Sequence, residues 1–426
     1  MPIGARNLIT GLGVVTSIGA GADRFAEGLR RGSCGIRMYE DPSAFAAARL
    51  DDFDPVAFIA ALPGCPKGLR SRAKSLWRRS TQSARISAAA AIEAWLDAIG
   101  EEVAGEPERT GLVAAGNNIN KQYQADGAWQ YEQRPEYLSP RHAFLSLDTH
   151  AMSQISELLG ILGFGLNIGA SSASGNAALW TALQLLRSGE VDRVLVCGVS
   201  QELSSLERQA YLNIGAMAPA TCSTDPQKLY RPFDKASTGF VAGEGAACVV
   251  LETAEAAVAR GASAWAVLSG ASLLLSGSHL PASDAEGERR AMMRALERAA
   301  LTPEDIDMVN AHGSGSRQGD AVECQAIGDA FGESGPWVNS TKSLVGHCLT
   351  SAGLVEAAAC ALQIRDGFVH PNRNLDCPVG AQLRFAGSQA VQAQVRNVIS
   401  NSFGFGGINS SVILSHPDGH YPYGRQ

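Results

Sequence analysis

The chain has 426 residues, of which 45% are hydrophobic, and a formal net charge of −7. A chain of this length can bury one large core or two modest ones. Its negative charge argues against nonspecific binding to nucleic acid or to an anionic membrane surface. No apolar run is long enough to span a bilayer, and residues 1–22 lack a charged segment with a cleavage site. The sequence therefore predicts a cytoplasmic protein with no membrane or nucleic-acid partner.

Nine cysteines are scattered along the chain, and no CxxC pair occurs. Several of them lie inside apolar runs, such as Cys197, Cys248 and Cys360. Disulfides persist mainly in oxidising compartments. Buried free thiols in a reducing cytosol are therefore the simplest interpretation of this pattern.

Strand-like and helix-like segments alternate throughout the chain, which favours an α/β architecture. Between them, the segment 117–145 has weak periodicity and is interpreted as an insertion or lid. The predicted elements are the glycine-broken strand Asn7–Thr16, the basic helical stretch Lys67–Arg85, its alanine-rich continuation Ile86–Ile99, the strand Thr110–Ala115 and the helix Ala151–Leu162.

A turn of small residues joins the next strand to a helix. The apolar strand Leu166–Ala170 runs into residues 171–175, and a helical apolar pattern starts at Asn176. The buried strand Asp192–Gly198 completes a βαβ unit. The helix N-terminus gathers free N–H groups and the positive end of the dipole, so it can hold a developing oxyanion. A serine-rich N-cap is the alternative interpretation.

The C-terminal part repeats the order of strand, small-residue turn, helix and strand, which indicates an internal duplication. No linker divides the two parts, so we expect one body of two fused halves, residues 1–255 and 256–416, followed by a mobile tail at 417–426. The predicted elements of this part are a short helix near Ala254–Arg260, the strand region Ala264–Leu275, the helix Ala285–Ala300, a helix start at Thr302–Asp305, the strand Ile306–Val309, the helix Ala321–Phe331 and the strands Asn397–Ser400 and Ser410–Leu414.

Two histidines stand on glycine-rich turns that follow strands. His312 lies in Asn310-Ala-His-Gly-Ser-Gly-Ser, and His347 ends the run Lys342-Ser-Leu-Val-Gly-His. A lone histidine is usually structural, but two on matching turns indicate a shared site. A third tight turn is Asn401–Asn409. The other histidines show no ligand spacing and no HExxH motif occurs, so we expect no metal.

These motifs resemble those of the β-ketoacyl-acyl-carrier-protein synthases, condensing enzymes of the thiolase fold, over nearly the whole chain. The matching segments are His312-Gly-Ser-Gly-Ser with Asp320 and Glu323, Lys342 with His347, Gly404-Phe405-Gly-Gly with Asn409, Arg231-Pro-Phe-Asp234 and Gly239–Gly245. The resemblance implies two fused βαβαβαββ halves in a five-layered α-β-α-β-α body. It also implies a homodimer that binds an acyl carrier protein, and no cofactor, because the phosphopantetheine arrives on the carrier.

One position departs from the family pattern. The family nucleophile is a cysteine three residues before a glycine at a helix N-terminus, and counting back from Gly175 places Ser172 there. Ala170 and Ser171 also differ from the usual Thr-Ala, which favours a natural replacement over an engineered one. A serine hydroxyl ionises less readily than a thiol and forms an oxygen ester, a poorer acyl donor, so loading and elongation should both suffer.

Decarboxylation of a malonyl thioester does not need the thiolate. It creates an enolate whose oxygen needs hydrogen-bond donors, and neutral His312 and His347 can supply them at about 3 kcal/mol each. The chain thus resembles the synthase-like decarboxylases of polyketide β-branching cassettes, in which serine replaces the cysteine and malonyl-carrier protein becomes acetyl-carrier protein. Ser172, His312 and His347 are the predicted catalytic residues.

The resemblance implies roles for further residues around this site. The N–H groups of Ser172 and Phe405 are expected to form an oxyanion pocket. The predicted gate residues are Phe403, Gly404 and Phe405. The residues expected to support the histidine turns are Lys342, Asp320 and Glu323.

Carrier docking is predicted at the densest run of cations in the chain, Lys67 to Arg85. An acidic carrier needs a local basic patch on a protein whose own net charge is negative. The family counterpart of this run takes part in docking, which implicates Arg70, Arg72, Lys74 and Arg78. A solvated helix face is the alternative interpretation.

Two other functions stay open. In the first, Ser172 is a true nucleophile and the chain is an elongating synthase or an acyltransferase. The absence of Gly-x-Ser-x-Gly disfavours a hydrolase-like elbow but leaves acylation open. In the second, the chain is a non-catalytic partner like the chain-length factors that pair with a synthase. Such partners generally lose the histidine pair, which this chain keeps.

Overall fold

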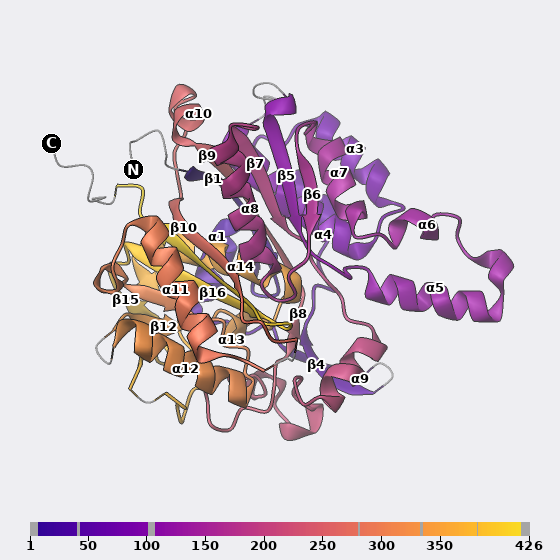
Figure 1. Ribbon diagram of the computed structural model, residues 1–426. Coiled ribbons are helices and arrows are strands. Elements are labelled where there is room, and N and C mark those ends of the chain that lie inside the picture. Colours follow the sequence, from indigo (N-terminus) through magenta and orange to yellow (C-terminus); the bar gives the residue numbers. More distant parts are fainter. Residues whose placement is uncertain are drawn as a thin grey trace.

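Strands from both ends of the chain form one twelve-stranded sheet through the molecule (Figure 1). The computed structural model describes residues 7–40, 43–100, 107–279, 282–332, 335–380 and 382–418. The strands pair in the order β14-β12-β11-β16-β17-β10-β1-β9-β7-β5-β6, and β2 pairs with β1. Their bounds are β1 (Asn7–Thr16), β2 (Gly19–Ala20), β5 (Thr110–Ala115), β6 (Gly165–Ile168), β7 (Arg193–Gly198), β9 (Gly245–Thr253), β10 (Ala266–Leu275), β11 (Met308–Asn310), β12 (Trp337–Asn339), β14 (Arg384–Phe385), β16 (Asn397–Gly404) and β17 (Ile408–Ser415).

The pairing pattern repeats in the two halves of the sheet. In one half β6, β5 and β7 are parallel, and β9 and β1 follow antiparallel. In the other half β12, β11 and β16 are parallel, and β17 and β10 follow antiparallel. The halves meet where Leu8 and Ile9 of β1 pair with Val267 and Ala266 of β10. This repeat agrees with a duplication, while the boundary at residues 255/256 stays a prediction.

Helices form three layers around the two halves of the sheet. α8 (Ser174–Ser188) and α14 (Ala352–Asp366) lie in the middle and contact strands of both halves. α4 (Gln82–Ile99) packs on β1 and β9 on one outer side, and α11 (Ala285–Ala299) packs on β10 and β17 on the other. Because α14 is covered on all sides, its sequence is apolar almost all round. The result is the predicted five-layered body of the thiolase-like fold.

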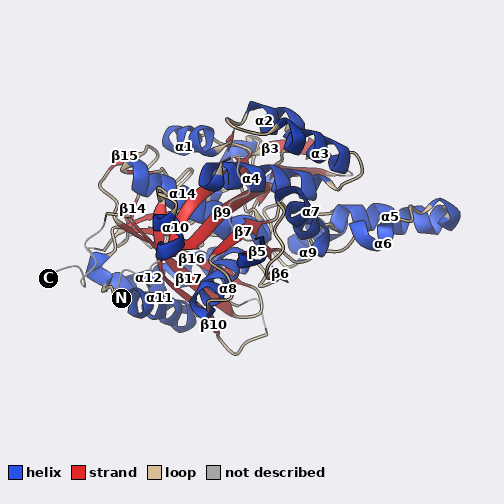
Figure 2. Cartoon of the chain, turned by 90° about the horizontal axis from the view of Figure 1, so that it is seen from above, coloured by secondary structure: helices blue, strands red, loops and turns tan. Residues whose placement is uncertain are grey.

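Shorter elements complete the body, seen from above in Figure 2. The strands β3, β4 and β8 form a separate three-stranded sheet, and β13 pairs with β15. The bounds of these strands and helices are β3 (Arg37–Glu40), β4 (Ala44–Ala48), β8 (Ala242–Gly243), β13 (Phe368–Val369), β15 (Val391–Gln392), α1 (Ala22–Arg31), α2 (Pro55–Ala61), α3 (Lys67–Trp77), α7 (Thr149–Leu159), α9 (Ser205–Asn213), α10 (Ala254–Ala259), α12 (Arg317–Phe331) and α13 (Lys342–Val345).

The segment 117–145, predicted as an insertion or lid, forms α5 (Lys121–Gln133) and α6 (His142–Leu145). In both views α5 projects away from the body (Figures 1 and 2), and no residue of this helix is buried. Its weak periodicity follows from that position, since no face of α5 packs against a core. Large apolar side chains are exposed in this arm, namely Trp129, Tyr131, Tyr137 and Phe144.

The prediction of one helical stretch from Lys67 to Arg85 was wrong. α3 ends at Trp77, and Thr81 begins α4 as its N-cap by accepting a hydrogen bond from the Ala84 N–H. The helix-favouring residues on both sides of the break hid it, because a capping threonine is also compatible with a helix interior. The elements α1, β3, β4 and α2, which precede this region, were not predicted.

Two predictions in the C-terminal part were also corrected. Thr302–Asp305 has the capping box of a helix start, but it forms only a 3₁₀ turn because the chain enters β11 at Met308. α12 begins at Arg317 rather than at Ala321, and the Ser316 hydroxyl caps it by accepting from the Gly319 N–H. Local capping chemistry therefore located turns correctly but did not fix the length of the element that followed.

Residues 419–426 of the predicted tail lie outside the described residues, and Pro417 and Asp418 form a turn after β17. None of the nine cysteines, all of which lie in the described part of the chain, forms a disulfide, and Cys197, Cys248 and Cys360 are buried as predicted. Within the described part of the chain, no helix combines the length and apolar character needed to cross a membrane.

Candidate active site

Ser172 lies on a sharp turn between β6 and α8. Ser171 adopts the left-handed region with φ 50°, which only a turn held by its surroundings tolerates in a non-glycine residue. The Ser174 hydroxyl holds the turn by accepting from the Ala170 N–H (2.8 Å) and donating to the Ser171 carbonyl (2.7 Å). Gly404 packs against the same turn, where an added Cβ would lie 2.8 Å from the Ala170 carbonyl oxygen. The small residues of this stretch are required by the close approach of β16.

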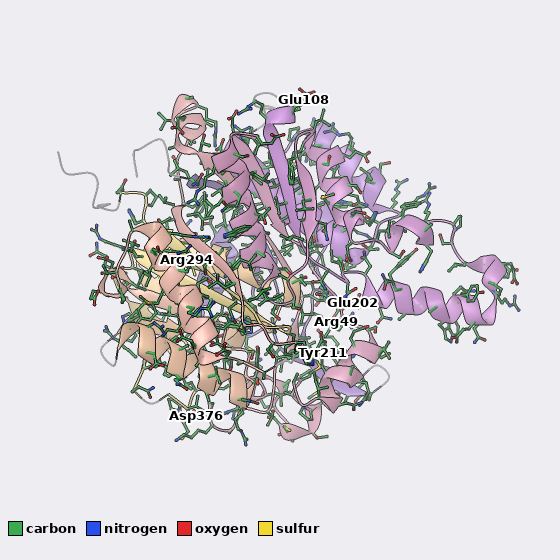
Figure 3. All side chains as sticks on the ribbon, in the orientation of Figure 1. Arg49, Glu108, Glu202, Tyr211, Arg294 and Asp376 are labelled. Carbon is green, nitrogen blue, oxygen red and sulfur yellow. The ribbon has the colours of Figure 1, made fainter. Side chains whose placement is uncertain are left out.

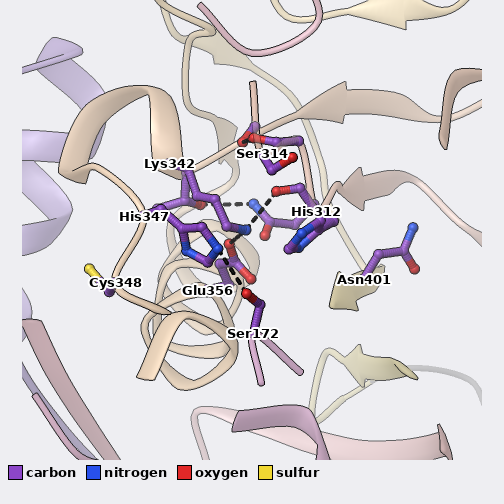
Figure 4. Close-up of polar contacts among 12 residues, drawn as sticks. Ser172, His312, Ser314, Lys342, His347, Cys348, Glu356 and Asn401 are labelled. Atoms are coloured by element: carbon purple, nitrogen blue, oxygen red, sulfur yellow. Dashed lines mark hydrogen bonds and ion pairs between the residues drawn. The ribbon is translucent and has the colours of Figure 1, made fainter. Parts of the chain in front are cut away.

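His347 faces Ser172 from the turn that precedes α14 (Figure 4). Its Nε2 lies 3.0 Å from the Ser172 Oγ, and the Leu349 N–H donates to its Nδ1 over 3.1 Å. A neutral imidazole whose Nδ1 is an acceptor carries its proton on Nε2. His347 is therefore the donor to the Ser172 Oγ, and neither of its nitrogens is available to take the proton of that hydroxyl.

His312 reaches the same space from the end of β11. Glu323 accepts from the N–H groups of His312 and Gly313, each over 2.8 Å, and the Lys342 ammonium donates to the His312 carbonyl oxygen over 2.6 Å. The two imidazole rings lie 5.7 Å apart, centre to centre, at an angle of 82°. Buried charged side chains therefore hold both ends of the peptide that carries the His312 ring.

Lys342 and Glu356 form an ion pair inside the protein, drawn in Figure 4. Both side chains are 1% exposed. Burial raises the pKa of Glu356 to about 7, and the neighbouring ammonium opposes that shift. A buried ion pair is tolerable only when further hydrogen bonds satisfy its charges, and the His312 carbonyl provides one for Lys342. The pair therefore positions the His312 turn from behind and does not line the cavity.

Burial lowers the pKa of both His312 and His347 well below the usual 6.5, and the positive charge of Lys342 lowers both further. Both rings are neutral near pH 7, and each then carries one N–H to donate. Fixed donors aimed at a position where negative charge develops are the usual means by which enzymes stabilise an oxyanion. The two rings have this arrangement on one side of the cavity.

Asp320 supports the His312 turn from a greater distance. Its carboxylate accepts from the Phe233 N–H (2.6 Å) and from the Gly315 N–H (3.0 Å). It thereby joins the segment Arg231–Asp234 to the glycine-rich turn. Burial raises the pKa of Asp320 to about 8. Asp320 does not line the cavity that contains the two histidines.

The predicted gate residues lie at the end of β16, beside the serine turn. Phe403 is buried with its ring 5.8 Å from that of His312, whereas Phe405 is 45% exposed. The Ser171 hydroxyl donates to the Phe405 carbonyl oxygen over 3.3 Å. This contact joins the serine turn to the end of β16, and the oxyanion pocket made of the Ser172 and Phe405 N–H groups stays a prediction.

A cavity of about 270 Å³ connects these groups, and Ser172, His312 and His347 all line it. Tyr211 of α9, which is labelled in Figure 3, also lines it. The Tyr211 ring packs edge-to-face against Phe240. Polar residues that the sequence analysis missed line the cavity as well: Asn117, Lys121, Gln201, Glu207 and Thr350. The sequence pattern could have indicated two of these residues, because Asn117 and Gln201 come shortly after predicted strands.

The predicted docking cations lie on and just after α3, and none of them lines the cavity. Arg72, Lys74 and Arg78 are exposed and Arg70 is half-buried. Arg70, Lys74 and Arg78 recur every four residues, so they share one face. The helix has no acidic residue of its own, and Arg72 donates to the Leu158 carbonyl over 3.3 Å. The face is an exposed basic surface.

The fold and the site together define a class of protein. A duplicated thiolase-like body that places a potential nucleophile at the start of a buried central helix, opposite two histidines, is the arrangement of the condensing enzymes. The chain belongs to the β-ketoacyl synthase family: residues 6–257 match the family model for the beta-ketoacyl synthase N-terminal domain, and residues 265–376 match the model for its C-terminal domain.

Two relatives are similar to the chain over nearly its whole length. The polyketide biosynthesis malonyl-ACP decarboxylase PksF of Bacillus subtilis is 34% identical over 409 residues, which cover 96% of each chain. The 3-oxoacyl-[acyl-carrier-protein] synthase 2 of Coxiella burnetii is 32% identical over 426 residues, which cover 96% of this chain and 98% of the relative. Both a decarboxylase and a synthase are therefore among its relatives.

Solved structures agree with the family. The ishigamide ketosynthase/chain length factor has a TM-score of 0.83 at 29% identity, covering 96% of this chain and 98% of that one. A type II polyketide synthase ketosynthase in complex with its acyl carrier protein, bound to the hexaketide, has a TM-score of 0.81 at 26% identity, covering 96% and 99%.

Proposed function

We propose that the protein decarboxylates malonyl-acyl-carrier protein to acetyl-acyl-carrier protein in polyketide biosynthesis. The observation that carries the proposal is the contact between Ser172 and His347, in which the serine stands at the family's nucleophile position beside a histidine that cannot deprotonate it. A serine needs such a base to become a nucleophile. The similarity to the malonyl-ACP decarboxylase PksF of Bacillus subtilis supports the same function.

The proposed decarboxylation uses the two histidines that the site keeps from the family pattern. The malonyl carboxylate leaves as CO₂, and its bonding electrons pass into the thioester to form an enolate. His312 and His347 donate hydrogen bonds to the enolate oxygen, and each donor lowers the barrier by about 3 kcal/mol, or 10²–10³ in rate. Because Ser172 carries no acyl group for the enolate to attack, the enolate carbon is protonated instead of forming a carbon–carbon bond.

A carrier protein delivers the substrate in this proposal. The docking face consists of the exposed cations Arg72, Lys74 and Arg78 with the half-buried Arg70. Opposite charges steer an acidic carrier to this face. The ketosynthase solved with its carrier supports a carrier partner. The acetyl product would serve β-branching, in which a hydroxymethylglutaryl-CoA-synthase-like enzyme consumes it. The free cysteines support a reducing cytoplasm as the location.

We also propose a homodimer through the edge of the sheet. Among the residues that the structure describes, β6 is the last strand of the sheet and pairs only with β5. Apolar side chains are exposed at this edge, with Leu162 66% and Leu166 39% exposed. An exposed edge strand with apolar neighbours is a template for pairing with another strand, and a second copy offers the same edge. Light scattering on the parent and on Leu166→Lys tests this, and a monomeric parent would contradict it.

An elongating synthase or acyltransferase is the second candidate function, and the synthase relative from Coxiella burnetii favours it. It requires an acyl group on Ser172. A non-catalytic partner resembling a chain-length factor is the third, and the retained pair His312 and His347 argues against it.

The deciding experiment incubates malonyl-carrier protein with the purified protein and follows the carrier by intact-mass spectrometry. The proposal predicts loss of CO₂ from the carrier-bound group, which leaves acetyl-carrier protein, and no acyl adduct on the protein itself. A stable acyl group on Ser172 would favour the second candidate. An unchanged malonyl-carrier protein would contradict the proposal.

A further inference from the structure

Decarboxylation leaves an enolate carbon that needs a proton, and His312 and His347 serve its oxygen rather than its carbon. We infer that Ser172 is the general acid of this step, and that its hydroxyl delivers the proton to the enolate carbon. The inference rests on the proposed decarboxylation and assigns a chemical role to the serine that replaces the family's cysteine.

The hydrogen bonds at Ser172 fix the direction in which its proton can go. The Leu349 N–H occupies Nδ1 of His347, so the proton of that ring is on Nε2 and points at the Ser172 Oγ. The Oγ is thus an acceptor in this contact, and its own proton is left for another partner. Ser172 lines the cavity together with both histidines, so a group bound in the cavity can accept that proton.

The same contact brings the enolate carbon to the hydroxyl. An enolate oxygen that accepts from His347 Nε2 must lie within about 3 Å of that nitrogen, and Ser172 Oγ is itself 3.0 Å from it. The carbon that needs the proton is two bonds away from the enolate oxygen. A thioester bound through His347 therefore lies close enough for this carbon to approach the Ser172 hydroxyl.

The alkoxide that Ser172 becomes has its own stabilisation. It stands before the first turn of α8, a 15-residue helix with no acidic residue in that turn, so the positive end of the helix dipole favours negative charge at this position. When the product leaves the His347 ring, Nε2–H again donates to the oxygen. Neither His312 nor Lys342 is needed to move a proton.

The step balances as follows. The bond between the carboxyl carbon and the malonyl Cα breaks, CO₂ leaves, and the electron pair forms the enolate. That pair then takes the Ser172 proton to form the third C–H bond of the acetyl group. Solvent water returns a proton to the Ser172 alkoxide through the open cavity. The net reaction consumes one proton from water and needs no oxidant, reductant or other co-reactant.

The test separates proton delivery from bond cleavage by allowing the enolate to react with labelled CO₂ instead of taking a proton. Malonyl-carrier protein is incubated in buffer containing ¹³CO₂ with the parent, with Ser172→Ala and with Ser172→Thr. Mass spectrometry measures acetyl-carrier protein and ¹³C in the remaining malonyl group. In Ser172→Ala, acetyl formation should fall by about 10²-fold, and ¹³C should enter the malonyl carboxyl because the enolate waits long enough to re-add CO₂. Ser172→Thr keeps the hydroxyl and should restore acetyl formation with little label.

Three results would overturn the inference. Equal acetyl formation by Ser172→Ala, without label, would mean that water supplies the proton, and the proposed decarboxylation would stand. Lost acetyl formation without label would mean that Ser172 acts on bond cleavage. A parent that releases no CO₂ would remove the proposed function itself. If the threonine variant does not fold, the ¹³C that Ser172→Ala incorporates into the malonyl carboxyl decides the inference by itself.

Discussion

Two turns in equivalent places of the duplicated sheet are built in different ways. The turn after β6 carries Ser172, and the turn after β12 carries Lys342 and His347. Small residues, hydroxyl–backbone bonds and the close approach of Gly404 hold the serine turn. A buried ion pair, Lys342 with Glu356, holds the histidine side.

Under the proposed function, the difference explains how a change at one position alters the reaction while the rest of the site is kept. The histidine side depends on buried charges, so a replacement there leaves an unpaired charge in the core. The serine turn is held by its backbone and by Ser174, so the identity of residue 172 does not determine the shape of the turn. A side chain that alters the fate of the enolate can therefore be exchanged while the donors His312 and His347 stay in place.

Removing the charge on the histidine side should have the largest effect. Lys342→Met leaves Glu356 buried without its partner, and breaking such a pair costs about 3–5 kcal/mol of stability. Chemical denaturation measures this loss. Lys67→Met is the matched control, because Lys67 is exposed at the start of α3 and should change stability by less than about 0.5 kcal/mol. Equal, small changes in both variants would show that the ion pair does not anchor the turn.

The next largest effect is expected from replacing the two histidines, and it should appear in activity rather than in stability. His312→Ala and His347→Ala should each lower decarboxylation by about 10²–10³, measured as acetyl-carrier protein formed per minute. His416→Ala is the control, since His416 follows β17 and does not line the cavity. Near-normal turnover by either cavity variant, with an intact fold, would refute its role at the enolate oxygen.

The serine turn can be disturbed without touching a polar group. Gly404→Ala places a Cβ 2.8 Å from the Ala170 carbonyl oxygen. Overpacking of this kind lowers the free energy of unfolding by about 1–3 kcal/mol. Thermal unfolding should show the loss, together with reduced decarboxylation because Ser172 moves. Gly387→Ala is the matched control, because its added Cβ meets nothing within 4 Å. If the two variants behave alike, packing of β16 does not define the serine turn.

The sequence predicted the serine turn well because its signal is local: an apolar strand, five small residues and an apolar helical face. The roles of Lys342 and Glu323 came from the resemblance to the family, since no periodicity reports that a charged side chain is buried. The partner of Lys342, Glu356, was missed because it looks like an ordinary polar position of α14. The polar cavity residues Gln201 and Thr350 were missed because they come together only in three dimensions, where Thr350 donates to Gln201 over 3.2 Å.

The smallest effect is expected at the surface, away from both turns. The double variant Arg72→Glu, Lys74→Glu should weaken carrier binding several-fold, because each exposed charge contributes about 0.2–1 kcal/mol, and salt should screen the difference. Steady-state kinetics with malonyl-carrier protein should show a raised KM. Turnover of malonyl-pantetheine, which has no carrier, should stay unchanged. An equal loss with both substrates, or with neither, would remove α3 as the docking face.

The central claim is that this site forms the enolate and then protonates it. The most direct measurement offers malonyl-carrier protein together with an acyl-primed carrier and determines by intact mass how the malonyl group is divided between products. The account predicts acetyl-carrier protein with no β-ketoacyl-carrier protein, whatever the ratio of the two substrates. A β-ketoacyl product that grows with the primed carrier would show that Ser172 accepts and passes on an acyl chain, and would contradict the account.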